Sequence, residues 1–400
     1  MFFALKGEHF NGNIYAKSAL DHGAKYCVID EKEYALDNHF ILVENALEAL
    51  QQLATFHRKA LGIPIVSLTG SNGKTTTKEL INSVLSTQFK TTATTGNLNN
   101  HIGVPITLLN MSKDTEIGIV EMGANHPKEI EFLCKIAYPD YGVITNFGKA
   151  HLEGFGSVEG VIKAKSELYE HLKKHNKVIF VNQNDEKQLK QTGDYKSVYT
   201  FGKQDSIGPN PILKTSLPFV ELEYEDKLIK SHLTGKYNFD NISIAIAVGE
   251  YFKITPENIK LAIENYIPSN NRSQIIYKGS NTILLDAYNA NPTSMIAALE
   301  NFKHVEGPNK VLFLGDMFEL GKDASLEHQN VVDYLETHFV CKVNLIGSNF
   351  FKTIVKKSFI TKFETFEDLK SQINATKINN AQILIKGSRG MALERVLELL

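Results

Sequence analysis

The chain has 400 residues, of which 42% are hydrophobic and 22% are charged, and its 43 Lys and Arg nearly balance 45 Asp and Glu. This length exceeds one ordinary hydrophobic core, so we expect two or three domains. The formal net charge of −2 argues against nucleic-acid binding and against attachment to an acidic membrane surface, since both require a basic field.

Three widely spaced cysteines, Cys27, Cys134 and Cys341, fit neither a disulfide framework nor a zinc site and favour buried thiols in a reducing compartment. The apolar start, "MFFAL", is too short for a secretory signal, and no later run is long enough to span a membrane. We therefore predict a cytoplasmic protein without nucleic-acid partners or integral membrane association, and we expect a monomer.

Along the chain, residues 1–61 alternate short apolar runs with helical patterns, and "LGIP" at 61–64 marks a boundary. Strand-like runs rich in Val and Ile then alternate with helical stretches, as in "IPIVSLTG", "IGIVEMGA", "YGVITNFG" and "KVIFVNQND", which is typical of parallel strands buried on both faces. A second α/β series follows residue 270. Between them, residues 200–230 contain more Pro and alternating strands, which indicates an antiparallel insert.

The stretch "SLTGSNGKTTTKEL" at 67–80 follows a strand-like run and opens a helical pattern. Amides of its Gly-rich turn and of the helix N-terminus would converge on a phosphate, while Lys74 would reach the terminal phosphates and Thr75 would ligate Mg²⁺. The common pattern also requires Gly at position 68, where this chain has Leu68. A helix N-terminus capped by Thr is the alternative, but the order of strand, Gly-Lys-Thr and helix favours nucleotide binding.

Two polar residues follow the next strand-like runs. Glu121 ends "IGIVE", and its carboxylate is placed either to ligate a metal near the γ-phosphate or to cap a helix. His151 lies in the loop "FGKAHLEGFGS", where a surface position and a ligand role are both open.

The segment "SVEGVIKAKSELYEHLKKH" predicts a helix with Ser157 as its N-cap and Lys165 on its apolar stripe. A desolvated lysine has a lowered pKa, and its neutral amine can react with CO₂ to give a carbamate that holds a metal. The alternative is that Lys165 extends to solvent or pairs with a carboxylate, and the residues alone favour that alternative.

Taken together, these stretches resemble the Mur ligase family, ATP-dependent amide-forming ligases of peptidoglycan precursor synthesis. That family's phosphate loop lacks the earlier Gly, as "TGSNGKTT" does. The resemblance extends over most of the chain through "GNLNNHIGVPITLL", "EMGAN", "DAYNANP", "GDMFELG" and "IKGSRG". "EMGAN" and "YNANP" in particular resemble the members that add D-alanyl-D-alanine.

The resemblance implies an α/β fold of three domains: a shortened N-terminal domain that binds the UDP substrate (1–61), a central ATP-binding domain with a parallel sheet (62–268), and a C-terminal Rossmann-like domain for dipeptide and nucleotide (269–400). It implies ATP, Mg²⁺ and a carbamylated Lys165 as cofactors. The implied substrates are UDP-N-acetylmuramoyl-tripeptide and D-alanyl-D-alanine.

The resemblance also implies roles for individual residues. The implied catalytic residues are Lys74, Lys165 and Arg272, and the implied metal ligands are Thr75, Glu121, His151 and Lys165. The implied ATP site contains Thr69, Gly70, Ser71, Asn72, Gly73, Lys74, Thr75, Thr76, Asn238, Asn241, Arg272 and Asp286. The substrate-binding candidates are Phe3, Lys6, Gly7, Asn99, Asn100, His101, Asn289, Asn291, Lys386, Ser388 and Arg389.

Two departures from the family pattern qualify these roles. Tyr237 replaces a His that often precedes Asn238 in the family, and the segment that usually precedes "FFALKG" and touches the uridine nucleotide is missing. Either the sequence is truncated at its start, or UDP recognition relies on the remaining residues such as Phe3, Lys6 and Gly7, and a real shortening would weaken substrate binding. The rival hypotheses are another ligase of the superfamily, such as folylpolyglutamate synthase, and a non-catalytic nucleotide-binding regulator derived from a Mur ligase.

Overall fold

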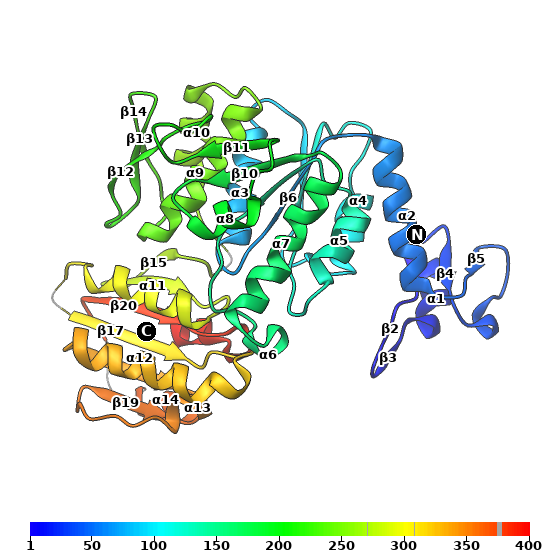
Figure 1. Ribbon diagram of the computed structural model, residues 1–400. Helices are drawn as coiled ribbons and strands as arrows, with labels where there is room; N and C mark the ends of the chain where they lie inside the picture. The colour runs from blue at the N-terminus through cyan, green and yellow to red at the C-terminus, as the bar shows by residue number, and fades with distance from the viewer. Residues whose placement is uncertain (270, 308, 374–377) are drawn as a thin grey trace.

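The computed structural model describes residues 1–269, 271–307, 309–373 and 378–400. It places three groups of elements along the chain, with an N-terminal unit set apart from the other two (Figure 1). No helix in these ranges is both long and apolar enough to cross a membrane.

The N-terminal unit is built on a small parallel sheet in the order β1-β4-β5, which closes over a core that includes Ala4, Ala16 and Phe40. A β2–β3 hairpin and helix α1 complete it. The bounds are β1 Phe2–Phe3, β2 Lys6–Gly7, β3 Phe10–Asn11, α1 Ala16–Asp21, β4 Cys27–Ile29 and β5 Phe40–Leu42.

Helix α2 (Ala46–Leu61) links this unit to the rest of the molecule (Figure 1). It begins because the Asn45 side chain accepts bonds from two free backbone N–H groups, and it ends at Gly62, whose φ of 63° suits glycine. Arg58 on its last turns is buried and donates to Asp140 Oδ2 at 2.7 Å, which fixes α2 to the central domain.

The central domain holds a six-stranded, fully parallel sheet in the order β11-β10-β9-β6-β8-β7, as the Val- and Ile-rich runs predict. Its strands are β6 Ile65–Thr69, β7 Thr91–Ala93, β8 Ile117–Glu121, β9 Tyr141–Ile144, β10 Val178–Asn182 and β11 Val198–Phe201. Its helices are α3 Lys74–Leu85, α4 Gly103–Leu109, α5 Glu129–Ala137, α6 Leu152–Phe155, α7 Val158–Lys174, α8 Glu186–Thr192, α9 Lys236–Tyr251 and α10 Pro256–Asn265.

The predicted insert is confirmed as a separate antiparallel sheet of β12 (Ile212–Thr215), β13 (Glu221–Tyr224) and β14 (Lys227–Lys230). It packs its buried residues, such as Leu222 and Ile229, into the core on the α3 and α9 side of the central sheet.

The C-terminal domain holds a second six-stranded sheet, β15-β16-β20-β17-β18-β19, in which only the edge pair β15–β16 is antiparallel. Its strands are β15 Gln274–Lys278, β16 Asn281–Asp286, β17 Asn309–Gly315, β18 Lys342–Ile346, β19 Ile360–Phe363 and β20 Ala381–Lys386, and its helices are α11 Pro292–Lys303, α12 Ala324–His338, α13 Ser348–Phe351 and α14 Phe366–Ile373.

The loops after β6, β8, β16, β17 and β20 meet where the central and C-terminal domains face each other. In parallel α/β sheets, ligands bind beyond the carboxyl ends of the strands. The boundaries at residues 61 and 268 stay predictions, although β6 and β15 begin a few residues after them.

Candidate active site

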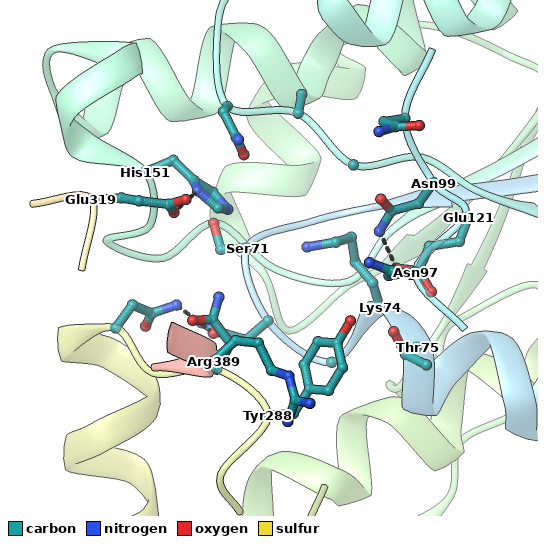
Figure 2. Close-up of a pocket in the computed structure, with 18 of the residues that line it drawn as sticks. Ser71, Lys74, Thr75, Asn97, Asn99, Glu121, His151, Tyr288, Glu319 and Arg389 are labelled. Carbon is teal, nitrogen blue, oxygen red and sulfur yellow. Dashed lines mark hydrogen bonds and ion pairs between the residues drawn. The ribbon is translucent and has the colours of Figure 1, made fainter. Parts of the chain in front are cut away.

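A cavity of about 1250 Å³ lies between the central and C-terminal domains (Figure 2). Both domains supply polar side chains to its walls. Among the residues singled out from the sequence, those that line it are Ser71, Asn72, Gly73, Lys74, Thr75, Thr76, Asn99, Asn100, His101, Glu121, His151, Asn238, Asn241, Arg272, Asp286, Asn289, Asn291, Lys386, Ser388 and Arg389.

The phosphate loop spans the gap between β6 and α3. Gly70 and Gly73 both have positive φ, at 147° and 78°, and a Cβ on Gly70 would lie 1.9 Å from Thr145 Oγ1. Only glycine fits that position. The turn therefore exposes its backbone to the cavity and places buried Thr75 in the first turn of α3.

A second loop, residues 145–148, fixes the phosphate loop from behind. The Ser71 N–H donates to Asn146 O at 3.0 Å, and the Thr145 hydroxyl donates to Asn72 O at 2.6 Å. Since both ends of the turn are held, the loop is arranged before any ligand arrives.

Lys74 folds back so that Nζ donates to Gly70 O at 2.8 Å. Burial lowers the pKa of Lys74 and the cation of Arg272 lowers it further, while the negative charges of Glu121 and Glu319 oppose the shift. Among the residues that the structure describes, Lys74 forms no ion pair, which suits a group that receives a phosphate.

Glu121 ends β8 and is 1% exposed. Asn99 Nδ2 donates to its Oε1 at 2.8 Å, whereas its Oε2 is buried without a hydrogen-bond partner among the described residues. An orphaned carboxylate oxygen beside a phosphate loop is suited to a hard cation. This geometry favours the ligand interpretation of Glu121 over the capping one.

His151 and Glu319 meet across the domain boundary, where His151 Nδ1 forms an ion pair with Glu319 Oε2 (Figure 2). Both residues adopt left-handed backbone conformations, with φ of 52° and 62°. The bond from His151 lowers the pKa of the Glu319 carboxyl below its ordinary value. Glu319 was not predicted as a site residue, although it lies within the "GDMFELG" stretch.

Lys165 is completely buried behind the cavity wall on α7, whose N-cap is Ser157 as predicted. Its Nζ donates to Ala124 O at 3.0 Å and lies 5.2 Å from the centre of the Phe155 ring, and it forms no ion pair within the described ranges. Burial, and after it the charge of Lys74, lowers the pKa of Lys165 well below its ordinary value. The interpretation in which Lys165 reaches solvent or a carboxylate is therefore wrong.

The opposite wall carries Arg272, whose guanidinium lies 3.5 Å from the centre of the Tyr288 ring. Its Nε is buried without a partner in the part of the chain that the structure describes. Tyr288 was also missed from the sequence, because its role depends on stacking that only the folded chain reveals.

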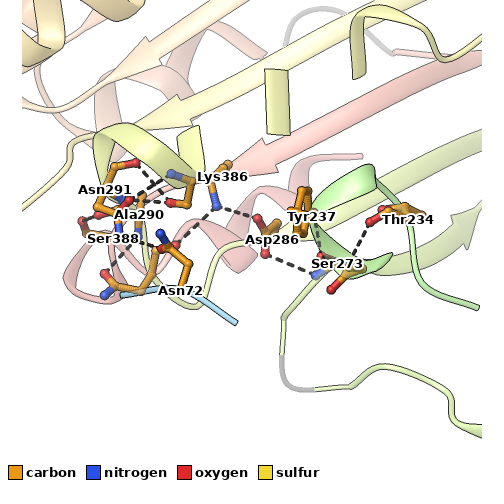
Figure 3. Close-up of polar contacts among 12 residues, drawn as sticks. Asn72, Thr234, Tyr237, Ser273, Asp286, Ala290, Asn291, Lys386 and Ser388 are labelled. Atoms are coloured by element: carbon orange, nitrogen blue, oxygen red, sulfur yellow. Dashed lines mark hydrogen bonds and ion pairs between the residues drawn. The ribbon is translucent and has the colours of Figure 1, made fainter. Parts of the chain in front are cut away.

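On the same wall, Lys386 Nζ forms an ion pair with Asp286 Oδ2 at 2.5 Å, and Asp286 Oδ1 accepts the N–H of Ser273 at 3.2 Å (Figure 3). The two residues were predicted to contact different ligands, the ribose and the dipeptide. Here each is the other's charge partner.

A network of asparagines lies beneath the phosphate loop at the start of α9. Asn241 donates to Asn238 Oδ1 at 2.8 Å and accepts from the Thr77 hydroxyl at 3.0 Å. Tyr237, the departure from the family pattern, has its hydroxyl 2.9 Å from Ser273 Oγ and so joins the central domain to the C-terminal domain (Figure 3).

Further contacts hold the two walls together. Asn291 Nδ2 donates to Asn72 Oδ1 at 2.7 Å (Figure 3). Lys149 forms an ion pair with Glu327 at 2.6 Å. The structure is therefore a closed arrangement, with the cavity assembled from both domains.

Six predicted residues lie outside the cavity lining. Thr69 ends β6, Gly70 begins the phosphate loop, and Lys165 lies behind the cavity wall. Phe3, Lys6 and Gly7 lie in the N-terminal unit, where Lys6 forms ion pairs with Asp30 at 2.8 Å and Glu31 at 2.9 Å. Their predicted role in UDP binding stays a prediction.

A phosphate loop faces a second α/β domain across a polar cavity, an arrangement suited to an enzyme that brings a nucleotide and a second substrate together. The Mur ligase middle domain model matches residues 68–249, and the model of the Mur ligase, glutamate ligase domain matches residues 271–389. The chain belongs to the Mur ligase family.

Relatives that match the full chain indicate which members of the Mur ligase family it is similar to. The UDP-N-acetylmuramoyl-tripeptide–D-alanyl-D-alanine ligase of Bacillus subtilis is 34% identical over 100% of this chain and 89% of its own length. A crystal structure of MurF from Acinetobacter baumannii is 29% identical with a TM-score of 0.86, covering 99% of this chain and 89% of that one. The structure of MurF ligase from Thermotoga maritima in complex with ADP is 28% identical with a TM-score of 0.85, covering 99% of this chain and 92% of that one.

Proposed function

We propose that this chain joins D-alanyl-D-alanine to UDP-N-acetylmuramoyl-tripeptide at the expense of ATP, in peptidoglycan precursor synthesis. The observation that carries the proposal is the cavity itself, with Lys74 of the phosphate loop on one wall and Arg272 on the other. The full-length similarity to ligases with this activity supports it.

The chemical difficulty is to bring two anions together. A carboxylate oxygen of the tripeptide attacks the γ-phosphorus of ATP, ADP leaves, and an acyl phosphate remains. The amine of the dipeptide then attacks the acyl carbon, loses its proton, and expels phosphate. Lys74 and Arg272 stabilise the negative charge that accumulates during the first step.

The residues present fit a divalent cation. Thr75, Glu121 and His151 all line the cavity, and Glu121 keeps one buried oxygen without a partner. These three residues would hold Mg²⁺, which would supply positive charge to offset that of the reacting anions. Asn99 orients the Glu121 carboxylate for this purpose through its 2.8 Å bond.

Lys165 fits the proposed carbamate. A fully buried amine with a lowered pKa and a carbonyl as its hydrogen-bond partner is suited to react as a neutral nucleophile. Its nitrogen would attack the carbon of CO₂ and release one proton, and the resulting anion would extend past Ala124 toward the cavity. The carbamate would supply a further oxygen ligand for a cation there.

The first experiment measures phosphate release from ATP with UDP-N-acetylmuramoyl-tripeptide and D-alanyl-D-alanine. We expect turnover that requires all three substrates. Addition of glutamate to a folate instead would favour the folylpolyglutamate synthase alternative, and nucleotide binding without acceptor-dependent turnover would favour a regulator.

We further propose that the ligase acts in the cytoplasm as a monomer. Analytical sedimentation of the purified protein tests its oligomeric state.

A further inference from the structure

Arg272 lies in a turn whose backbone is unusual on both sides. Asn271 and Ser273 both adopt left-handed conformations, with φ of 57° and 48°, a region that residues with a side chain seldom occupy. The Asn271 carbonyl accepts the N–H of Tyr288 at 3.2 Å, and the Ser273 N–H donates to Asp286. Because the Arg272 guanidinium also stacks on the Tyr288 ring, the turn is a fixed part of the C-terminal domain.

The start of α9 is fixed to the phosphate loop of the central domain. Asn241 accepts a hydrogen bond from the hydroxyl of Thr77 in α3, the helix that begins at Lys74. A Cβ on Gly73 would collide with the Asn241 side chain, so α9 and the phosphate loop pack closely. Asn241 in turn donates to Asn238 at 2.8 Å. The first turn of α9 therefore has a defined position relative to Lys74.

These two fixed structures meet at the hydroxyl of Ser273. Ser273 is 6% exposed, and its Oγ lies 2.9 Å from the hydroxyl of Tyr237 in α9 (Figure 3). Asn238 Nδ2 donates to the same oxygen at the longer distance of 3.5 Å. Burial, and after it the charge of Asp286, raises the pKa of Tyr237 above its ordinary value, so this hydroxyl keeps its proton. A hydrogen bond therefore joins the residue beside Arg272 to the helix that packs on the phosphate loop.

This bond lies where charge opposes the closed arrangement. Lys74 and Arg272 are close enough that the charge of Arg272 lowers the pKa of Lys74. Two cations that face each other repel until an anion lies between them. The bond offsets this repulsion next to Arg272 itself, whereas the ion pair of Lys149 with Glu327 joins the domains outside the cavity lining.

We propose that Tyr237 and Ser273 are positioning residues: the bond between them holds the Arg272 guanidinium at the phosphate loop. This inference rests on the proposed function, in which Lys74 and Arg272 stabilise charge while the acyl phosphate forms. Neither hydroxyl has to touch a substrate in this role. Loss of the bond should therefore slow the first chemical step, because the guanidinium is displaced, while ATP binding changes little.

The test measures acyl phosphate, trapped with hydroxylamine, from ATP and UDP-N-acetylmuramoyl-tripeptide without the dipeptide. Tyr237→Phe removes only the hydroxyl, and Ser273→Gly removes its partner with a residue that tolerates a φ of 48°. For each variant we expect the rate at saturating ATP to fall about tenfold or more, with KM for ATP changed less than about threefold. The double variant should be about as slow as each single one, because all three lose the same bond.

A second arm separates the positioning of Arg272 from a general effect on the fold. Adding Tyr237→Phe to Arg272→Lys should slow the reaction less than about twofold further, because the hydroxyl acts through the guanidinium. The matched controls are Asn271→Gly, at the other left-handed position of the turn, and Glu327→Gln, which removes a domain contact outside the cavity lining. Both controls should stay within about twofold of the wild-type rate.

A raised KM for ATP at an unchanged saturating rate would overturn the inference and make Tyr237 a nucleotide contact. Equal losses from Tyr237→Phe in the wild-type and Arg272→Lys backgrounds, or a loss of the same size in Glu327→Gln, would also overturn it, by making the bond one domain contact among several. If the wild type forms no acyl phosphate from the UDP substrate, the proposed function fails. If it does and both single variants match it, only this inference fails.

Discussion

At the scale of single residues, the site depends on ionisable groups buried without counter-charges. Lys165 has no exposure and bonds only to Ala124 O, and Glu121 Oε2 has no partner in the described ranges. Such groups destabilise a fold unless they acquire partners. Their proximity to one cavity indicates that a ligand supplies what the protein leaves out.

The first prediction concerns Lys165. Replacing it by Ala removes the proposed carbamate, so kcat should fall by about 100-fold or more. Acetate or formate should restore part of the activity by filling the same space with a carboxylate. Lys163→Ala, on the exposed side of the same helix, is the control and should keep its activity. A folded Lys165→Ala enzyme that carboxylates fail to rescue would count against the carbamate.

The second prediction concerns Lys74. Because its ammonium is placed at the phosphate loop to stabilise charge on the transferred phosphoryl group, Lys74→Ala should slow ADP formation by about 100-fold or more. The measurement is ADP release in the presence of the UDP substrate, alongside the melting temperature. A folded variant that forms ADP at the wild-type rate would remove Lys74 from the mechanism.

The sequence predicts the residues that local spacing defines. Ser71 to Thr76 follow a strand and open a helix, so they could be found without coordinates. The apolar stripe alone favoured an exposed or paired Lys165, and only the family resemblance pointed to the opposite interpretation. Glu319 and Tyr288 could not be found without coordinates, because their partners His151 and Arg272 are distant in the chain. The ion pair of Asp286 with Lys386 could not be predicted either, because it arises only when strands β16 and β20 lie side by side.

At the scale of elements, long runs of Val and Ile predicted the central strands, whereas short or polar strands gave no signal. β7 reads "TTA" and is part of the parallel sheet only because β8 lies beside it. β15 is the edge strand of its sheet, and its antiparallel direction follows from the short connection to β16. Tertiary pairing decides such elements, not their own residues.

A third prediction concerns α7. His171 on this helix is buried, its Nε2 has no partner among the residues described, and burial followed by the charge of His175 lowers its pKa to about 4. Since this pKa lies below the ordinary value of 6.5, His171 is protonated at a higher pH in the unfolded chain than in the folded chain. The contribution of His171 to stability is therefore complete above pH 6.5 and is lost as the pH falls toward 4.

Urea unfolding of the wild type and His171→Gln between pH 7 and pH 4 measures this effect. Over that pH range, the free energy of unfolding of the wild type should fall by up to about 3 kcal/mol more than that of the variant. His126→Gln, at an exposed position, should follow the wild type. Parallel loss of stability in the wild type and His171→Gln would assign the acid sensitivity to other groups.

At the scale of the whole molecule, the two sheets face each other with their carboxyl-end loops, and neither domain carries a complete site. Contacts such as Asn291–Asn72 and Lys149–Glu327 hold the closed form. A closed cavity must open for substrates as large as a UDP-linked peptide to enter and leave.

The fourth prediction tests this opening. A Cβ on Gly148 would lie 3.3 Å from the Cβ of Thr293, close to the roughly 3.5–4.5 Å that a disulfide requires. The double variant Gly148→Cys/Thr293→Cys should lose turnover at least about tenfold when oxidised and regain it with reductant. Each single variant under the same oxidant is the control. Full turnover of the oxidised form would mean that substrates pass without separation of the domains.

The division of the cavity between two walls also has a pharmacological consequence. A compound wedged beside Lys149 and Glu327, outside the cavity lining, would hold the walls apart and stop the enzyme without resembling ATP. High cellular concentrations of the nucleotide would not displace such a compound, because the two would not compete for the same atoms. Cell-wall synthesis could thus be blocked at the contact between the two domains instead of at the nucleotide site.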